Sequence, residues 1–489
     1  MRRKDSCNDG LKIFKKGKSV SFIILFILFL AIFFYILLFN KRRIKIPKIK
    51  HVYLITIDTL RADHLSCYGY PVKTTPFIDS LAKDGILFKN AFSQSATTCP
   101  SHASIMTGLY PSEHRVLANG YILEDSYTTL AEILKKDGFK TFAFTSTDRH
   151  FLASHINQGF EFYDEPPDTV KTYGYKYRPA RLTINKAIMH LDGSIHPDDK
   201  LFVWIHLFDP HLPYYPPKKY RNYVKKQLNK TFLRDFIERA KVNLEIFNNS
   251  FDNFYEHILG YDSEIRYVDD ELKRFFKIMK KRGFFKDSLI IITADHGEGL
   301  GQHNWLQHAK QIYQEEIHVP LIFYFSDTKI KGKVFSEYVE NFDIFSTVLD
   351  FLNIKLDKKL GKSISSVSLK DLIFFNKKVK KPVFVERQFY KERDGVEKAP
   401  LWKVEYEKGV RVALIKDGFK YIYASEYPDE FYNLEQDGFE LNNILSQKEK
   451  YSFKFKKLIM RKLSRFKNKK IRKVSEKIFR KLRGLGYVE

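Results

Sequence analysis

Three side chains suited to binding a metal ion follow two apolar runs of the chain. Asp58 comes directly after the run 52–57, and Asp295 and His296 come directly after the run 289–294. In open α/β sheets, sites assemble at the carboxyl ends of strands. Carboxylates with an imidazole suit zinc, manganese or similar ions, and carboxylates alone would suit calcium. We predict one divalent cation (Ca, Mn, Zn or Mg) on these three residues; the alternative is that each Asp only caps a turn.

A hydroxyl nucleophile is predicted at Thr98. It precedes a helix that should begin near Pro100 or Ser101, because Pro is well tolerated in the first turn of a helix. The helix N-terminus would present free N–H groups and a positive dipole end to an anion. A hydroxyl beside a divalent cation can ionise at neutral pH and attack sulfur or phosphorus. The alternative is that Thr98 is a simple N-cap.

Apolar runs that read as strands alternate with helical patterns. Most of the runs are continuous, which is typical of strands buried on both faces of a mainly parallel sheet. One helical pattern spans 262–281, with Gly283 placed to cap its end. This alternation predicts a doubly wound α/β fold with helices on both faces. The predicted strands are Val52–Ile57, Lys140–Thr145, Leu201–Leu207, Leu289–Ala294 and Pro320–Phe325.

Two further regions depart from this pattern. Residues 215–255 are polar and rich in aromatics, and we interpret them as an insertion that could line the substrate cleft. After residue 375, strands at 382–386, 410–415 and 420–424 predict a small antiparallel sheet. The predicted organisation is a basic cytoplasmic stub (1–18), a transmembrane anchor (19–39), a linker (40–50), a catalytic domain (51–375) and a C-terminal subdomain with a basic helical tail (376–489).

The anchor is predicted from residues 19–39, which carry no charge and are almost all apolar. As a helix they would extend roughly 30 Å, enough to cross a bilayer. A cleaved signal peptide is the alternative, but no small-residue cleavage site follows, only Asn40 and three basic residues. Because basic residues flank both sides, the charge rule orients the segment only weakly.

Charge and cysteine content bound the partners. The chain of 489 residues has a net charge of +26 and three cysteines, so an even disulfide framework is excluded. Lys and Arg dominate the segment 448–483, which contains only two acidic residues. A solvated helical face is the simplest interpretation of this tail, attraction to anionic lipid headgroups is the second, and nucleic acid is not expected.

Short motifs in one order along the chain resemble the sulfatase branch of the alkaline phosphatase superfamily. They are IDTLRADH at 57–64, TTCPSHASIMTG at 97–108, DPHLPY at 209–214, ADHGE at 294–298 and HAKQIYQEEIHVPL at 308–321. The resemblance implies an alkaline-phosphatase-like fold, metal ligands at Asp58, Asp295 and His296, and a nucleophile at Thr98. It also implies a leaving-group role for His211, charge neutralisation by Lys310, and a catalytic domain that faces outward from the membrane.

Three positions depart from the family pattern. The sulfatase nucleophile is a cysteine, oxidised to formylglycine, where this chain has Thr98, and Cys99 lies one residue out of register. The family's arginine is replaced by His102, which either serves catalysis in another way or packs structurally. Thr59 stands where many sulfatases have a further metal-binding Asp. The resulting set of site residues, Asp58, Thr98, Asp295 and His296, also resembles that of phosphotransferases with a threonine nucleophile.

We therefore predict a metal-dependent hydrolase of sulfuric or phosphoric esters. Between the two, threonine mildly favours phosphate, because a threonine sulfate ester has no easy internal route to release, whereas family membership favours sulfate. One alternative is a transferase or phosphodiesterase acting on a lipid or glycan at the membrane surface. A minor alternative is a non-catalytic binding module. A second metal ion would need ligands from Asp209, His211, His303 and His308.

Overall fold

The computed structural model describes residues 24–32, 47–147, 150–166, 177–327, 332–387 and 409–465. The chain forms two units, Met1–Ile46 and Pro47–Glu489. All of the elements discussed from here on, except one short helix, belong to the second unit.

The first unit corrects the predicted membrane anchor. Its described part is a helix over residues 24–32, which would extend only about 14 Å. No helix in the described part of the chain is long and apolar enough to cross a membrane. The predicted single-pass membrane localisation, with its extracytoplasmic domain, is therefore wrong on this finding. The stub 1–18 and the remaining anchor positions, 19–23 and 33–39, lie outside the described residues.

An eight-stranded sheet forms the centre of the second unit. The strand order is β10-β2-β9-β6-β1-β5-β3-β4, and every neighbouring pair is parallel except those made by β9. The predicted mainly parallel sheet is confirmed. The strands are β1 (His51–Ile57), β2 (Ile86–Phe92), β3 (Lys140–Thr145), β4 (Phe162–Asp164), β5 (Leu201–Leu207), β6 (Ser288–Ala294), β9 (His318–Phe325) and β10 (Lys333–Glu340).

Burial explains which strands the sequence predicted. Every residue of β1, β5 and β6 is buried, so their sequences are continuous apolar runs. The strands β2 and β10 were missed because charged and polar residues interrupt them where they face solvent. Three β-strands that lie next to one another, β6, β1 and β5, thus bring their carboxyl ends to one edge of the sheet.

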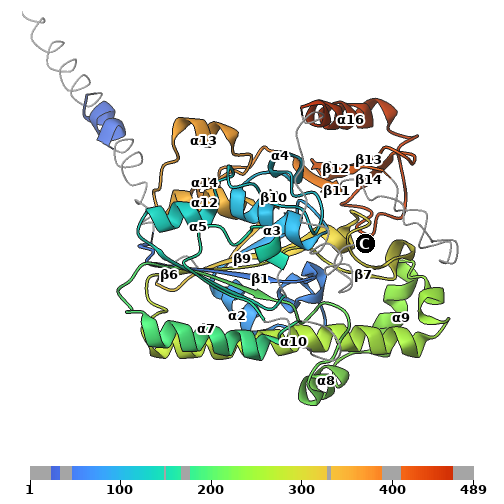
Figure 1. Ribbon diagram of the computed structural model, residues 1–489. Helices are drawn as coiled ribbons and strands as arrows, with labels where there is room; N and C mark the ends of the chain where they lie inside the picture. Colours follow the sequence, from blue (N-terminus) through green and yellow to red (C-terminus); the bar gives the residue numbers. More distant parts are fainter. Residues whose placement is uncertain are drawn as a thin grey trace, which may run out of the picture. The chain divides into compact units, whose positions relative to one another are not determined.

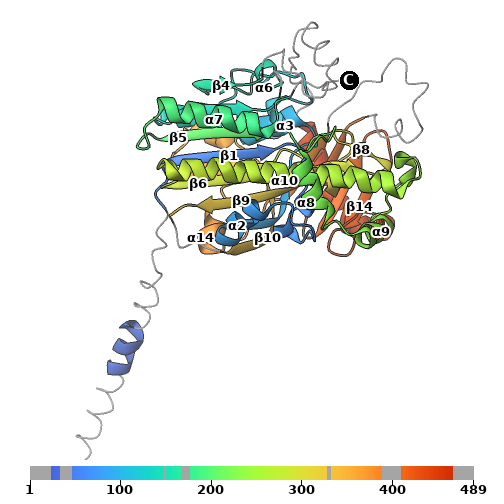
Figure 2. The same ribbon diagram turned by 90° about the horizontal axis from the view of Figure 1, so that it is seen from below.

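Helices cover both faces of the sheet, as predicted. Figure 1 shows α2, α7 and α10 below the sheet and α3, α5 and α12 above it, and Figure 2 shows α7 and α10 running along the lower face. The helices are α2 (Pro76–Asp84), α3 (Thr98–Thr107), α4 (Pro111–His114), α5 (Leu130–Lys136), α6 (His150–Ala153), α7 (Ala180–Ser194), α8 (Lys218–Lys225), α9 (Lys230–Arg239), α10 (Phe251–Lys281), α11 (Gln314–Ile317), α12 (Asp343–Phe351), α13 (Lys358–Ser363), α14 (Lys370–Phe375) and α16 (Glu449–Ser464).

The region 215–255 contains more helix than its weak pattern indicated. It holds α8, α9 and the start of α10, which begins at Phe251 rather than at residue 262. The end of α10 matches the prediction: Gly283 has a φ of +84°, and the N–H of Phe284 donates to the carbonyl of Met279 at 3.0 Å. This left-handed glycine closes the last turn of the helix.

The predicted small antiparallel sheet is present and has four strands. They are β11 (Val383–Arg387), β12 (Arg411–Lys416), β13 (Phe419–Ala424) and β14 (Glu430–Asn433), in that order. One face of this small sheet packs against Phe92 at the end of β2 and Ile317 at the end of α11. The other face packs against Phe455 and Ile459 of α16. The described part of the basic tail ends at residue 465, and the rest of the tail lies outside the described residues.

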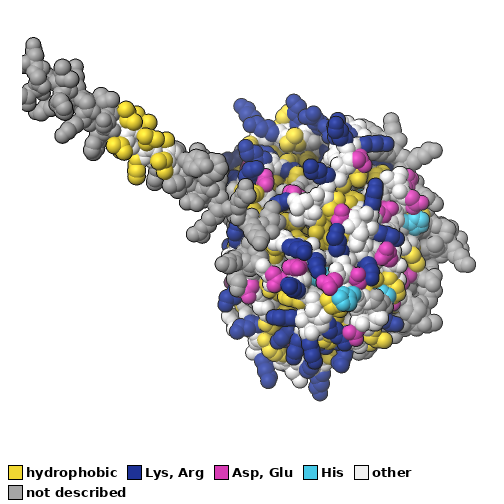
Figure 3. Space-filling view, turned by 90° about the vertical axis from the view of Figure 1, so that its left-hand side faces the viewer, with side chains coloured by type: hydrophobic (Ala, Val, Ile, Leu, Met, Phe, Trp, Pro, Cys, Tyr) yellow, Lys and Arg dark blue, Asp and Glu magenta, His cyan; other side chains and the backbone are white. Residues whose placement is uncertain are grey.

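The surface of the second unit is strongly basic on the face drawn in Figure 3. Lys and Arg side chains are spread over this face, with Asp and Glu side chains between them. Such mixed, exposed charge is typical of a solvated surface. The high net charge of the chain is thus accommodated partly by ordinary exposed side chains.

Candidate active site

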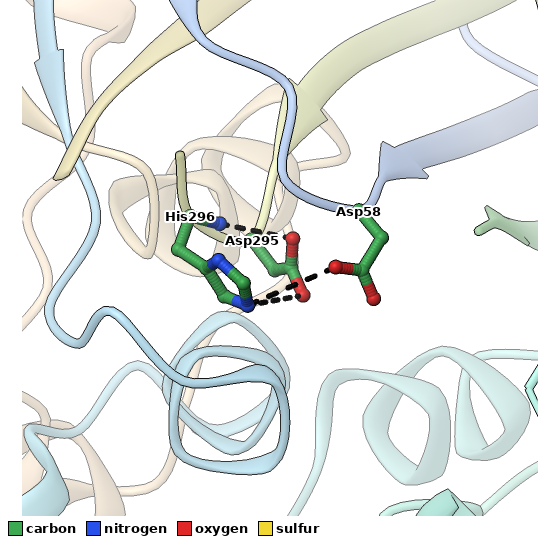
Figure 4. A group of neighbouring side chains, drawn as sticks. All are labelled: Asp58, Asp295 and His296. Carbon is green, nitrogen blue, oxygen red and sulfur yellow. Dashed lines mark hydrogen bonds and ion pairs between the residues drawn. The ribbon is translucent and has the colours of Figure 1, made fainter. Parts of the chain in front are cut away.

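The three predicted metal ligands meet at the carboxyl edge of the large sheet. Asp58 follows β1, and Asp295 and His296 follow β6, the strand paired with β1. Their side chains point toward one another (Figure 4), and their ligand atoms lie within 4.8 Å of one another. The Nε2 atom of His296 is 3.5 Å from Asp295 Oδ2 and 3.8 Å from Asp58 Oδ1.

The chemistry of this group fits a divalent cation. Asp58, Asp295 and His296 are 0% exposed. Both carboxylate oxygens of Asp58 and Oδ2 of Asp295 accept no hydrogen bond from any described residue. Burial raises the pKa of Asp58 to about 7, since the charged carboxylate lacks solvation. Buried carboxylates are normally paired or bound to metal, so these unpaired oxygens indicate a cation site.

Thr98 lies where a nucleophile would be needed. It is the first residue of α3, whose N-cap is Thr97, so the helix starts two residues earlier than predicted. The Oγ1 atom of Thr98 is 3.3 Å from Nε2 of His296. The hydroxyl therefore adjoins the three candidate ligands and stands at a helix N-terminus, where N–H groups favour an anion.

Cys99 is directed elsewhere and does not replace the missing family cysteine. Its Sγ accepts a hydrogen bond from the Ser154 hydroxyl at 3.4 Å. Burial raises the pKa of the Cys99 thiol to about 12, so the thiol stays protonated at neutral pH. One residue of register on a helix turns a side chain by about 100°, which separates Cys99 from the candidate ligands.

His102 lies beneath the site and holds its parts in place. Its Nδ1–H donates to the Thr98 carbonyl at 2.8 Å, and its Nε2 is 3.1 Å from the Thr56 hydroxyl. Nδ1 is also 3.7 Å from Oδ2 of Asp295. Burial and the neighbouring His206 lower the pKa of His102 to about 3, so the ring is neutral. Its contacts position the first turn of α3, because the ring bonds to the Thr98 backbone.

His206 borders the site and was not predicted from the sequence. It lies on β5 opposite Thr56 of β1, and its Nε2 is 3.4 Å from Asp58 Oδ2. Burial lowers the pKa of His206 to about 4. The one signal in the sequence was a polar residue inside an otherwise apolar strand. Only the register between β1 and β5 shows that this side chain reaches Asp58.

The predicted leaving-group residue His211 joins the site through His308. The His308 ring lies 4.3 Å from the His296 ring and 5.0 Å from the His211 ring, measured between centroids. Nδ1 of His211 donates to the Leu212 carbonyl at 2.6 Å, and Nδ1 of His308 is 3.2 Å from Glu298 Oε1. Three imidazoles thus form a row that begins at the candidate metal ligands.

Lys310 lies nearby but contacts a different group. Its ammonium is 4.8 Å from the centre of the Trp305 ring, and its side chain is 8% exposed. The backbone carbonyl of Lys310 accepts a hydrogen bond from Arg387 at 2.5 Å, which ties the segment to β11. The His308 ring contacts the candidate ligand His296, with ring centres 4.3 Å apart.

Two of the residues considered for a second metal ion have other partners, whereas His211 and His308 lie beside each other. Both carboxylate oxygens of Asp209 accept from the N–H of Ala180, at the start of α7. His303 pairs with Glu315 at 2.6 Å. Within the described ranges, Asp58, Asp295 and His296 form the one group with metal-binding geometry.

Thr59 adopts a backbone conformation that is rare for its type. Its φ is +54°, and a β-branched side chain is disfavoured there. The N–H of Thr59 is 3.3 Å from Asp295 Oδ1, and its carbonyl accepts from the Tyr261 hydroxyl at 2.7 Å. These contacts hold the turn after β1 against Asp295. Strained residues of this kind gather at functional sites.

Comparison with known proteins identifies the family of the chain. The family described as Sulfatase matches residues 50–354. The ulvan-active sulfatase of Formosa agariphila is 25% identical over 81% of this chain and 77% of its own length. The arylsulfatase of Clostridium perfringens is 23% identical over 82% of this chain and 91% of its own length.

Solved structures share the fold. The phosphonate monoester hydrolase of Agrobacterium radiobacter superposes with a TM-score of 0.68, 20% identity, and coverage of 85% of this chain and 96% of its own. The family match covers more than half of the chain, in the part that carries the buried Asp and His ligands and Thr98. The chain therefore belongs to the Sulfatase family, the sulfuric ester hydrolases of the alkaline phosphatase superfamily.

Proposed function

We propose that this protein hydrolyses sulfuric monoesters through a covalent ester on Thr98, with a divalent cation held by Asp58, Asp295 and His296. One observation carries the proposal: the Thr98 hydroxyl lies 3.3 Å from Nε2 of His296, beside buried carboxylate oxygens that have no hydrogen-bond partner among the described residues. A divalent cation bound there would supply positive charge for the threonine oxygen and for the anionic ester.

The chain's own residues perform the remaining tasks. The Thr98 hydroxyl releases its proton to solvent and its oxygen attacks the sulfur atom, the bond from sulfur to the alcohol oxygen breaks, and that oxygen takes a proton from a protein donor as the alcohol departs. His211 is the residue that we assign as proton donor, because it lies in the row of imidazoles that begins at His296. Water then attacks the sulfur of the Thr98 ester, which releases sulfate and restores the hydroxyl.

Two residues support this reaction without reacting. His102 fixes the first turn of α3 through the Thr98 carbonyl, so the nucleophile is held in one position. We assign to Lys310 the task of balancing the negative charge of the bound ester, because it follows His308 by two residues. Its contact with the Trp305 ring holds the ammonium within this part of the molecule.

Phosphoric monoesters are the second candidate substrates. The observation that favours them is the residue at position 98, a threonine in place of the cysteine that sulfatases oxidise to formylglycine. A formylglycine hydrate can expel sulfate through its second hydroxyl, whereas a threonine sulfate must wait for water. Attack of water on a phosphothreonine ester is a route that other hydrolases with a metal site use.

Hydrolysis of matched nitrophenyl esters tests both assignments. The full-length protein is assayed with nitrophenyl sulfate, phosphate, phosphodiester and phenylphosphonate, with Ca, Mn, Zn or Mg added and after chelation. We expect sulfate turnover that requires a metal and falls by about 10³-fold or more in Thr98→Ala. Thr97→Ala is the matched control, since it removes the neighbouring threonine hydroxyl and should retain activity.

Each result decides a different part of the proposal. Turnover of phosphate but not sulfate would move the substrate to the second candidate and leave the Thr98 mechanism intact. Activity that survives Thr98→Ala would refute the nucleophile. A mass increase of one sulfuryl or phosphoryl group on the Thr98 peptide, trapped during turnover, would support the covalent step directly.

A further inference from the structure

The segment that carries His308 and Lys310 has a strained backbone. This segment, residues 303–314, is called the site loop below; it contains β8 (Leu306–Gln307), which pairs with β7 (Gly299–Leu300). Non-glycine residues rarely adopt a positive φ, and they keep it only where the surrounding structure holds them. The position of the site loop therefore depends on contacts from other parts of the chain. The residues of the loop with a positive φ are His303 (+47°), Asn304 (+58°), Gln307 (+74°) and Ala309 (+79°).

Glu440, which follows the small antiparallel sheet, contacts both ends of the site loop. At the start of the loop, Nε2–H of His303 donates to the backbone carbonyl of Glu440 at 3.2 Å. At the end of the loop, the N–H of Gln314 donates to Oε2 of the Glu440 carboxylate at 2.7 Å. Nδ1 of His303 lies 2.6 Å from Oε1 of Glu315, so both ring nitrogens of this histidine have partners. One residue from a distant part of the sequence thus joins the two ends of a strained loop.

A buried ion pair holds the Glu440 carboxylate in its turn. Its Oε1 lies 2.7 Å from the ammonium of Lys420 on β13, and both side chains are 0% exposed. Buried charges of this kind are stable only when they are paired. Because β13 pairs with a strand on each side, β12 and β14, Lys420 offers a fixed point of attachment. One oxygen of Glu440 therefore faces the small sheet, and the other faces the site loop.

The same small sheet contacts the site loop at two more places. The Tyr313 hydroxyl donates to Glu430 of β14 at 2.7 Å, and the Tyr313 ring stacks on the His303 ring with centres 3.7 Å apart. Arg387 of β11 donates to the Lys310 carbonyl at 2.5 Å. Three elements after residue 382 thus support a loop whose His308 ring lies against a candidate metal ligand.

We propose that Glu440 is a positioning residue for the reaction at Thr98. Its carboxylate and its backbone carbonyl close the two ends of the site loop, so that Lys310 and His308 stay in place. Glu440 does not touch the reacting atoms and acts through the loop alone. The inference rests on the proposed function for the task of Lys310, whereas the contacts of Glu440 with the loop do not depend on the ester.

Two double variants of the full-length protein isolate the hydrogen bond between Glu440 and the loop. They are Glu440→Ala with Lys420→Met and Glu440→Gln with Lys420→Met. Both remove the whole ion pair, so neither leaves an unpaired buried charge. Glutamine keeps an oxygen that can accept from the N–H of Gln314, and alanine does not. The glutamine variant is therefore the matched control for the alanine variant.

A third variant, Gln314→Pro, removes the same hydrogen bond from the side of the loop. Gln314 is the first residue of α11, where proline is tolerated, and Tyr313 before it is extended (φ −76°, ψ 170°). The variant keeps the pair between Glu440 and Lys420. It should therefore behave like the alanine variant even if the alanine variant folds poorly.

Hydrogen exchange, measured by mass spectrometry on peptides that contain residues 303–314, gives a readout that needs no substrate. We expect exchange there to be about tenfold faster than in the wild type for the alanine variant and for Gln314→Pro. The glutamine variant should stay within about twofold of the wild type. Peptides from β1 should exchange at the same rate in all of these proteins, which separates opening of the loop from global unfolding.

Steady-state kinetics with the nitrophenyl ester that the wild type hydrolyses provides the second readout. We expect KM to rise about tenfold in the alanine variant, with a smaller change in kcat, because Lys310 attracts the anionic ester as it binds. Glutamine at position 440 should restore the KM. A merely structural role would instead lower the amount of active enzyme, which reduces the apparent kcat and leaves KM unchanged.

The two readouts distinguish failure of this inference from failure of the proposed function. Equal exchange of residues 303–314 in the alanine and glutamine variants would overturn the role of Glu440, as would faster exchange with an unchanged KM. If the wild type hydrolyses none of the esters, the proposed function fails, and hydrogen exchange still decides whether Glu440 holds the loop.

Discussion

Replacing Asp58 by Asn tests whether the candidate cation site lowers the free energy of unfolding without a metal ion and raises it when a metal ion is bound. Without a cation, and at a pH above its pKa of about 7, the Asp58 carboxylate is a fully buried charge whose two oxygens accept no hydrogen bond from the described residues. An uncompensated buried charge of this kind costs about 3–5 kcal/mol. Asparagine has the same shape and no charge. We therefore expect Asp58→Asn to unfold at a higher urea concentration than the wild type in the presence of a chelator.

The added metal reverses the comparison. A cation at a concentration one hundred times its Kd stabilises the wild-type protein by about 2.7 kcal/mol. The variant lacks one of the two carboxylates of the site, so it should gain much less. The difference between the two unfolding free energies should consequently shrink or change sign when Ca, Mn, Zn or Mg is added. Equilibrium urea unfolding, with and without chelator, measures both quantities.

Asp269→Asn is the matched control. Asp269 is also 0% exposed, but its carboxylate accepts from the N–H groups of Phe77 and Ile78 at the start of α2 and pairs with Arg266. Its replacement should destabilise the protein by about 1–3 kcal/mol with or without metal. If Asp58→Asn is less stable than the wild type in chelator, or if metal stabilises both equally, the inference of a cation site from unpaired oxygens is refuted.

Three further outcomes follow from the same structure. His102→Ala should reduce kcat by about 10²-fold with a smaller change in KM, because the first turn of α3 loses its anchor at the Thr98 carbonyl, and steady-state kinetics against Thr97→Ala would show it. Burial opposes the charged His303, but Glu315 raises its pKa to about 9, so the pair stabilises the fold fully below about pH 6.5 and loses up to about 3 kcal/mol as the pH rises to 9. Urea midpoints in chelator should fall over that range in the wild type and not in His303→Gln; parallel curves would contradict the pairing. Thr59→Gly should raise the thermal midpoint, since it removes about 1–2 kcal/mol of backbone strain at φ +54°, and an unchanged or lower midpoint would show that the turn is not strained.

Much of the site was accessible from the sequence because its residues follow local patterns. Asp58 and Asp295 stand at the ends of continuous apolar strands, and the carboxyl ends of parallel strands share one edge of a sheet. The position of Thr98 at a helix start followed from the nearby proline. The small C-terminal sheet was predicted from its β-branched and aromatic runs, to within one residue at most strand ends.

Other features depended on contacts between distant parts of the chain. His206 reaches Asp58 only because β5 pairs with β1 in one particular register. Asp209 was weighed as a metal ligand, but its carboxylate accepts from the N–H of Ala180 at the start of α7. The predicted membrane anchor rested on an apolar run alone, and no described helix is both long and apolar enough to span a bilayer.

The sequence by itself determined the fold class, the family and the main candidate residues, because hydrophobic periodicity and short motifs are local properties of the chain. The tertiary structure decided which polar atoms have partners. It directed Cys99 away from the candidate ligands, placed His102 under Thr98, and left the Asp58 oxygens without hydrogen bonds. The physical reason is that the direction of a side chain and the pairing of a buried charge depend on elements that pack together from remote positions in the chain.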